Sequence, residues 1–510
     1  MSRSKRFFTG LLTSYAAIGV NILYTLASVP LALHYLDKEE FGLWALATQF
    51  SGYLMLLEFG MSGSVARSLS DHKDQKEDGV YGSILRTGSR VFAIQGFLVA
   101  TAGFVLALFA PPLLDLPIRL HQPFTILMAA QAIMTGFKLS MGTLGAPLWC
   151  HQRLDLTNLI NCINMATSFA VLWIGFHIGW HIYSLPISNF VGQLLCIMAI
   201  YYVCKRLDYY PSKIHRGNYS PQIFRDLFHF GGGLFIMNIG AQLASASQVI
   251  MISRLLGIET AAAWSIATKV FSMAQQFVAR ILDSSAGGLA EMVVRKEFTQ
   301  LHKRFQELVS ITALIAVTSS AGIALMNGSF IELWTSGKVT WEPWNNYLLG
   351  CVLFSTAISR CLTGLTGITK ILGGMKYIFL FEGLVFVAVS ILLAPLLGIT
   401  GFLIAALACN SLITVNYAIT YTARYFKIKK IFVIHWFINC IIILIALAGI
   451  FLILRSNIIT HLSSLSQIFI QSIIFGLFIL PGIYFWAIDL KIKKEINLYI
   501  NMIISSLKKH

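Results

Sequence analysis

The chain has 510 residues, of which 56% are hydrophobic and only 12% are charged, with a mean hydropathy of +0.73. This composition excludes an ordinary soluble protein, in which about 25% of residues are charged. The formal net charge of +16 comes from basic residues dispersed over many short segments, whereas nucleic-acid-binding proteins gather them in one patch or stripe. We therefore expect an all-α, polytopic membrane protein without a nucleic-acid partner.

Apolar stretches of about 20 residues, the length that crosses a bilayer as a helix, recur along the whole sequence. They predict about fourteen transmembrane helices, in chain order at 7–33, 41–66, 88–110, 123–147, 156–178, 182–204, 231–256, 261–288, 307–334, 344–370, 377–397, 400–422, 432–454 and 467–489.

The distribution of basic residues predicts the orientation of these helices, because cytoplasmic loops collect Lys and Arg. With a cytoplasmic N-terminus, most basic residues fall on the cytoplasmic side, and Lys38, Arg119, Lys338 and Arg455 fall outside. Both termini are then cytoplasmic. The eight cysteines match neither a zinc pattern nor an external disulfide framework, so we expect no metal and no cofactor.

The two halves of the chain match at a shift of about 220 positions. Trp44 to Thr48 (WALAT) corresponds to Trp264 to Thr268 (WSIAT), and Lys138 corresponds to Arg360 after a small drift. The shift covers an even number of predicted helices, so the halves are parallel repeats, a design of secondary transporters that bind substrate near the membrane midplane. We predict six-helix bundles at 1–210 and 231–425, a cytoplasmic linker with an interfacial helix at 211–230, and two peripheral transmembrane helices with a basic tail at 426–510.

Cationic side chains inside predicted helices are the main candidate site residues. A charge at the bilayer centre costs roughly 2.5–3.5 kcal/mol on insertion scales, so such residues are usually functional. We predict that Lys138, Arg360, Lys269 and Arg280 bind an anionic substrate in a central water-filled cavity, because Arg and Lys suit phosphate or carboxylate. Arg280 could instead pair with Asp283 three positions away, whereas the other three have no acidic neighbour on their own helix.

Polar residues at helical spacing extend this predicted cavity. Gly142 and Gly145 share a predicted face with Lys138. The predicted polar lining consists of Asn21, Thr25, Gln131, Thr135, Gln242, Ser272 and Gln276, with Asn238 and Ser245 on the face of Gln242. Stripes of Ser, Thr and Gly alone are better explained by helix packing, because small and hydroxyl residues favour close helix contact in membranes.

Two acidic residues are candidates for coupling or charge balance. Glu58 and Asp283 lie inside predicted helices, where a carboxyl group could carry a proton or hold Na⁺ during a transport cycle. A structural role for Glu58 as the ion-pair partner of Arg67 or Lys138 is the alternative.

Several short motifs resemble polysaccharide biosynthesis flippases of the multidrug/oligosaccharidyl-lipid/polysaccharide exporter (MOP) superfamily. The motifs are Gly19-Val-Asn21 with Pro30, Glu40-Phe-Gly-Leu-Trp44, Leu57-Glu-Phe-Gly60 followed by Ser64-Val-Ala-Arg67, and Gln152-Arg153. The resemblance covers about residues 5–425 and implies two six-helix bundles around a central cavity that opens to either side in turn.

The resemblance also implies a substrate and a location. The substrate would be an undecaprenyl-pyrophosphate-linked oligosaccharide, such as an O-antigen unit for lipopolysaccharide biosynthesis. It would move from the cytoplasmic to the periplasmic leaflet of the bacterial inner membrane. The partners would be this lipid-linked oligosaccharide, membrane lipid and other surface-polysaccharide assembly proteins.

Three alternatives remain at this level. A peptidoglycan precursor flippase shares the layout and a cationic cavity, and a drug or cation antiporter of the same superfamily would need an acidic one. A membrane glycan polymerase or ligase would carry a long external loop with catalytic groups, which the predicted short external connections do not offer. We therefore expect a transporter and not an enzyme.

Overall fold

The computed structural model describes residues 3–72, 79–151, 153–212, 214–339, 341–369, 374–427 and 464–476. Every regular element in these residues is a helix, which confirms the all-α prediction. Ten helices among them are long and apolar enough to cross a membrane. The predicted helix at 432–454 lies outside the described residues, as does most of the one at 467–489.

The chain divides into two compact units, which we describe separately. Unit 1 comprises Met1–Ile266 and Phe379–Ile391, and unit 2 comprises Ala267–Ile378 and Leu392–His510. The predicted division into bundles at 1–210 and 231–425 stays a prediction.

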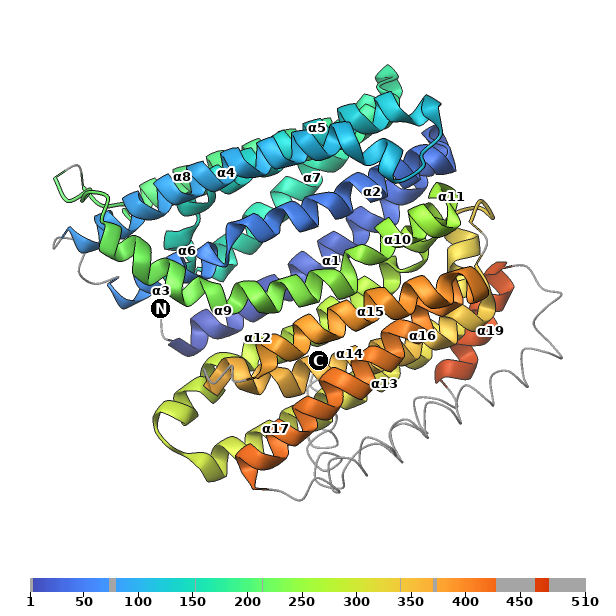
Figure 1. The fold of residues 1–510 in the computed structure, drawn as a ribbon. Helices are drawn as coiled ribbons and strands as arrows, with labels where there is room; N and C mark the ends of the chain where they lie inside the picture. Colours follow the sequence, from blue (N-terminus) through green and yellow to red (C-terminus); the bar gives the residue numbers. More distant parts are fainter. Residues whose placement is uncertain are drawn as a thin grey trace, which may run out of the picture. The chain divides into compact units, whose positions relative to one another are not determined.

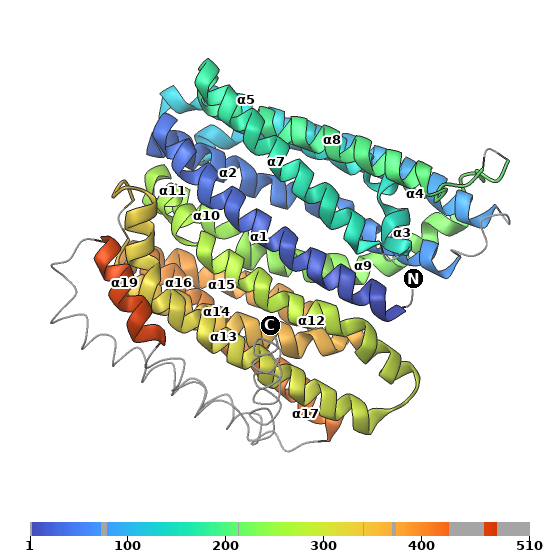
Figure 2. The ribbon, with the colours of Figure 1, turned by 180° about the vertical axis from the view of Figure 1, so that it is seen from behind.

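Unit 1 is built from helices that succeed one another along the chain and from part of α15 (Met375–Leu397). The others are α1 (Arg3–Tyr35), α2 (Lys38–Leu54), η1 (Met55–Glu58), α3 (Met61–Asp71), α4 (Val80–Leu113), α5 (Ile118–Ser140), η2 (Gly142–Leu144), α6 (Ala146–Cys150), α7 (Leu154–Ile178), η3 (His181–Tyr183), α8 (Ser184–Arg206), α9 (Pro221–Ser245), α10 (Ser247–Leu256) and α11 (Ile258–Ala267). In Figures 1 and 2, α4 lies along α5, and α7 lies along α1 and α8.

Glycines allow the closest helix contacts of unit 1. A Cβ atom built on Gly96 of α4 would lie 2.3 Å from the carbonyl oxygen of Gly136, and one built on Gly136 of α5 would lie 2.4 Å from that of Gly96. The same device joins α9 to α15, where a Cβ on Gly383 would lie 2.6 Å from the Gly240 carbonyl oxygen. Small residues are the usual means of close helix approach in membranes, where the hydrophobic effect does not drive helices together.

The segment between α8 and α9 is fastened to the start of α4. The Asn218 N–H donates to Ser83 Oγ (3.2 Å), and the Ser220 N–H donates to Thr87 Oγ1 (3.1 Å). Ser220 also caps α9, because its Oγ accepts the Ile223 N–H at 3.3 Å. The predicted interfacial helix at 221–230 is therefore the first part of the longer α9, since a favourable cap followed by Pro221 starts the helix there.

Several predicted transmembrane helices are interrupted, which corrects their predicted bounds. The helix predicted at 41–66 breaks after η1, the one at 231–256 breaks at Ala246, and the one at 261–288 breaks at Thr268. The helix predicted at 123–147 ends at Ser140, so Gly142 and Gly145 do not continue the face of Lys138. Hydropathy detects apolar length and is insensitive to such local changes in backbone direction.

Unit 2 consists of the remaining helices and a π-helical turn. They are α12 (Lys269–Val294), α13 (Phe298–Trp334), α14 (Pro343–Thr369), the rest of α15, α16 (Ile399–Cys409), η4 (Asn410–Val415), α17 (Asn416–Phe426) and α19 (Ser464–Ile474). Buried amides and hydroxyls connect them: Asn327 donates to Asn346 at 2.9 Å, and Ser355 donates to Asn410 at 2.8 Å. Such interhelical hydrogen bonds satisfy polar groups that lipid cannot.

Replacing Gly136 by Ala is expected to destabilise the protein by about 1–3 kcal/mol, because the new methyl group overlaps a backbone carbonyl that cannot rotate away. The measurement is the apparent melting temperature of purified protein in detergent. Gly63→Ala is the matched control, since no atom lies within 4 Å of a Cβ at that helical position. Equal melting temperatures for the two variants would contradict the assigned contact between α4 and α5.

Candidate functional site

The most informative local feature is the break in the second predicted transmembrane helix. η1 ends at Glu58, and the next two residues adopt left-handed backbone conformations, with φ of 53° at Phe59 and 70° at Gly60. α3 then starts at Met61. Glycine accepts this conformation at no steric cost, whereas a residue with a side chain gives up roughly 1–2 kcal/mol. Phe59 must therefore be held in place by its surroundings.

Hydrogen bonds to Glu58 organise this break. Its carboxylate Oε1 accepts the backbone N–H of Ser62 at 2.6 Å, and its carbonyl oxygen accepts a hydrogen bond from Gln95 Nε2 at 2.9 Å. The first N–H groups of a helix have no partner within it, and a negative charge is favourable at this end. Glu58 thus caps α3, while its Oε2 receives no hydrogen bond from the described protein.

Aromatic packing fixes the break against α9. The ring of Phe59 lies 4.5 Å from that of Phe235 and 6.0 Å from that of Phe228, centroid to centroid. The Tyr53 hydroxyl donates to the Gln242 carbonyl oxygen at 3.4 Å. These contacts hold the strained Phe59 and set the position of Glu58 relative to the polar face of α9.

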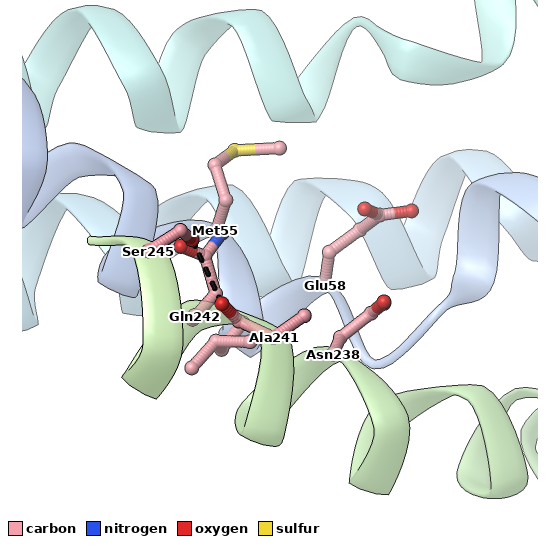
Figure 3. A pocket seen from close by; sticks show the side chains of 7 residues that line it. Met55, Glu58, Asn238, Ala241, Gln242 and Ser245 are labelled. Carbon is pink, nitrogen blue, oxygen red and sulfur yellow. Dashed lines mark hydrogen bonds between the residues drawn. The ribbon is translucent and has the colours of Figure 1, made fainter. Parts of the chain in front are cut away.

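A pocket of about 250 Å³ lies between the break and α9. It is lined by Met55, Leu56, Glu58, Asn238, Ala241, Gln242 and Ser245. Figure 3 shows the carboxylate of Glu58 and the amide of Asn238 extending in the same direction, and Ser245 donating to the Ala241 carbonyl oxygen (2.7 Å). The polar residues of α9 thus line this pocket of unit 1 together with Glu58, while the predicted central cavity stays a prediction.

Glu58 makes no ion pair with any described residue, so its predicted pairing with Arg67 or Lys138 is wrong. The physical reason is the break itself, which places the Ser62 N–H closer to the carboxylate than any cation. Lys138 lies in the last turn of α5 with an exposed side chain and no ion pair within the described residues. It is available to an anionic ligand.

Several predicted lining hydroxyls are used inside their own helices. Thr135 is buried and donates to the Gln131 carbonyl oxygen at 2.7 Å, and Thr25 donates to the Asn21 carbonyl oxygen at 2.9 Å. Ser272 donates likewise to the carbonyl oxygen of Thr268. For these residues helix packing is the better explanation, because a helix carbonyl one turn away is always within reach of a hydroxyl.

In unit 2 the structure brings Arg360 and Asp283 together. Arg360 Nη2 on α14 lies 3.5 Å from Asp283 Oδ1 on α12, with 59% and 45% of the side chains exposed. Asp283 therefore pairs with Arg360 and not with Arg280, which was the alternative for Asp283. Arg360 has no acidic neighbour on its own helix, as expected, but it meets one on a neighbouring helix. The exposure and the length of the contact make it a weak pair.

The other predicted residues of α12 differ in exposure. Lys269 is the first residue of the helix and is half-buried, whereas Arg280 and Gln276 are exposed. The neighbouring Gln275 donates to Thr356 Oγ1 on α14 at 3.0 Å. Neither Lys269 nor Arg280 forms an ion pair with another described residue.

Sequence reasoning missed the roles of Phe59, Ser62 and Met55. The available signal was Gly60 directly after a Glu-Phe pair, because a glycine inside an apolar stretch marks a possible left-handed position. Nothing in the local sequence indicates the aromatic contact with α9, which depends on residues about 170 positions away in the chain.

Comparison with protein families gives a match to a polysaccharide biosynthesis protein family over residues 10–286, more than half of the chain. The chain belongs to this family. Comparison with curated protein sequences gives no match. The resemblance drawn from the short sequence motifs is thus confirmed at the level of the family.

Solved structures show the fold that this polysaccharide biosynthesis protein shares. An inward-facing multidrug-resistance MATE transporter of the MOP superfamily is 13% identical, with a TM-score of 0.67 over 79% of this chain and 94% of that one. The lipid II flippase MurJ, in an inward closed conformation, is 14% identical, with a TM-score of 0.63 over 93% and 98%. A MOP superfamily transporter from Pyrococcus furiosus, described as having a binding pocket of reverse polarity, is 11% identical, with a TM-score of 0.66 over 83% and 96%. The protein is a multi-pass membrane protein with the MOP transporter fold.

Removing the Glu58 carboxylate is expected to weaken the start of α3. Glu58→Ala should cost about 1 kcal/mol, the usual effect of losing a helix cap, and Glu58→Gln should cost less because its amide oxygen can still accept the Ser62 N–H. Thermal unfolding in detergent measures both, with Glu332→Ala on an exposed site of α13 as the control. A loss in Glu58→Ala no larger than that in Glu332→Ala would show that the cap is unimportant.

The pair of Arg360 with Asp283 is expected to contribute less than about 1 kcal/mol to stability, because both side chains are largely solvated. A double-mutant cycle with Arg360→Ala and Asp283→Ala measures this coupling energy. A coupling above about 2 kcal/mol would mean that Arg360 is mainly structural, which would argue against a role in binding.

Proposed function

We propose that this protein moves an undecaprenyl-pyrophosphate-linked oligosaccharide from the cytoplasmic to the periplasmic leaflet of the bacterial inner membrane by alternating access. The oligosaccharide would be an O-antigen or another surface-polysaccharide repeat unit. The family match over residues 10–286 carries the proposal. The fold shared with MurJ, a flippase for lipid II, supports it.

Exposed cations in each unit are assigned to the anionic part of the substrate. Lys138 in unit 1 and Arg280 in unit 2 are exposed and form no ion pair with another described residue. Arg360 has only its long contact to Asp283. Lys269, at the start of α12, is half-buried and is assigned to the same role. A guanidinium can grip a phosphate with two parallel hydrogen bonds, and an ammonium can act as a point charge beside it.

Asp283 is assigned to charge balance. A pyrophosphate bound at Arg360 would compete with Asp283 for the same guanidinium, and Asp283 would re-form the pair when the substrate leaves. Binding of H⁺ or Na⁺ by the released carboxylate would couple the cycle to an ion gradient. A ligand biases two conformations only through its different affinity for them, and this exchange supplies such a difference.

The alternatives differ in the charges they require. A drug or cation antiporter would need acidic residues where the exposed helical charges are mainly basic, and a glycan polymerase or ligase would need catalytic groups on an external loop. A flippase for a peptidoglycan precursor needs the same cationic residues as the proposed function. It is separated from the proposal only by which lipid-linked glycan is transported.

Loss of either cation is expected to reduce transport. Lys138→Ala and Arg360→Ala should lower the rate of lipid-linked glycan movement tenfold or more, because a hydrogen bond to a charged group is worth about 1.5–3 kcal/mol. Arg360→Lys should do less harm, since it keeps the charge and loses only the second hydrogen bond. A leaflet-resolved assay in proteoliposomes with matched protein amounts measures the rates.

Arg119→Ala is the control for this experiment. Arg119 lies on the same helix as Lys138, is 66% exposed and pairs with Glu39 at 2.5 Å. Its loss should leave transport near the wild-type rate, because exposed ion pairs contribute little. Wild-type transport by both Lys138→Ala and Arg360→Ala would remove the assignment of the anion site.

A further inference from the structure

The pocket between η1 and α9 in unit 1 has a size that suits part of an organic molecule. Its volume is about 250 Å³. No group of three or more His, Cys, Asp or Glu side chains that could hold a metal is found in the described part of the chain.

Three polar groups that line this pocket are not used by the described protein. Glu58 Oε1 accepts the Ser62 N–H, so Oε2 can accept a hydrogen bond from a ligand. The side-chain amides of Asn238 and Gln242, one helical turn apart on α9, form no hydrogen bond with a described residue. Ser245 differs, because its hydroxyl already donates to the Ala241 carbonyl oxygen.

The chemistry of these groups selects the ligand class. A carboxylate only accepts hydrogen bonds, whereas each amide both donates and accepts them. Sugar hydroxyls do both as well, so adjacent hydroxyls of one ring can donate to Glu58 while they exchange hydrogen bonds with Asn238 and Gln242. A phosphate or an acidic sugar would be repelled by the negative charge of Glu58.

The groups are also held in fixed positions. Glu58 is locked by the cap on α3, and the contact of Phe59 with Phe235 ties the break to α9 one turn before Asn238. The backbone of Gln242 is bound by the Tyr53 hydroxyl. Prior fixing of the binding groups lowers the entropic cost of binding a flexible ligand.

We propose that Glu58, Asn238 and Gln242 form a subsite for a neutral sugar ring of the transported glycan. The subsite rests on the proposed function and adds that different residues bind the pyrophosphate and the sugar. Basic residues bind the pyrophosphate, and the carboxylate and two amides of this subsite bind hydroxyl groups of the carbohydrate.

The test compares two lipids that differ only in the sugar. Purified full-length protein is titrated with undecaprenyl pyrophosphate and with undecaprenyl pyrophosphate carrying one N-acetylhexosamine, and the ratio of the two Kd values is the readout. Wild type should prefer the sugar-bearing lipid. Asn238→Ala and Glu58→Gln should each reduce that preference about tenfold, the effect of one lost hydrogen bond to or from a charged or well-placed group.

Gln248→Ala is the matched control, because this amide lies on neighbouring α10 and is already bonded to the Ala244 carbonyl oxygen at 2.9 Å. The preference should survive in this variant. An unchanged preference in Asn238→Ala and Glu58→Gln, or none in the wild type, would overturn the subsite. Loss of affinity for both lipids to the same degree would also overturn it, since that is the result of general damage to the protein.

A second measurement separates the subsite from the proposed function. Ser245→Cys is labelled with a maleimide in the presence and absence of 100 mM-scale neutral N-acetylhexosamine, and labelling is read at that peptide by mass spectrometry. Protection should be several-fold, and Asn238→Ala should abolish it. If neither lipid binds, the proposed function fails, while sugar protection still supports the subsite and its absence overturns it.

Discussion

Hydrocarbon offers no hydrogen bonds, so a helix inside a bilayer must satisfy its own backbone, and every interruption frees polar groups that need another partner. In this protein the interruptions coincide with the polar residues of interest. Glu58 ends η1 and caps α3, Gln242 precedes the change at Ala246, Lys269 follows the one at Thr268, and Asn410 begins the π-helical turn and accepts from Ser355. The positions of Glu58, Gln242 and Lys269 thus coincide with places where helices end or change direction, whereas Arg280 and Arg360 lie inside continuous helices.

The charged candidate residues differ in how strongly other groups of the protein bind them. Lys138 has no ion-pair partner within the described residues, and Arg360 has one distant and largely solvated partner. Glu58 differs from them, because its Oε1 accepts a hydrogen bond from the backbone N–H of Ser62 in α3. Cations with weak or no ion pairs inside the protein suit a ligand that must bind and leave. A carboxylate that is held by a backbone hydrogen bond suits a fixed contact. Under the proposed function, different residues of this protein would therefore bind the anion and recognise the hydroxyl groups.

Much of the fold could be predicted from the sequence, because apolar length and helical spacing are local properties. The helices around Asn21, Lys138 and Arg360 and the polar face of α9 with Asn238 and Gln242 are found where the pattern placed them. The break at Phe59 could not be predicted from hydropathy, because the apolar stretch continues across it. The contact of Arg360 with Asp283 joins residues 77 positions apart, and local spacing favoured Arg280 instead. Hydroxyls such as that of Thr135 were predicted to line the cavity, but they donate to carbonyl oxygens of the preceding helical turn. The sequence does not show that these hydrogen bonds form.

The two successive left-handed residues after Glu58 have a consequence for how this protein tolerates change. The left-handed backbone at position 60 favours glycine. Phe59 keeps its own left-handed conformation because its ring packs against Phe228 and Phe235. An alteration of Phe228 or Phe235, which do not line the pocket, would let the chain relax toward ordinary helix and move the carboxylate away from its partners. Defects at this pocket can therefore originate in apolar residues that do not line it.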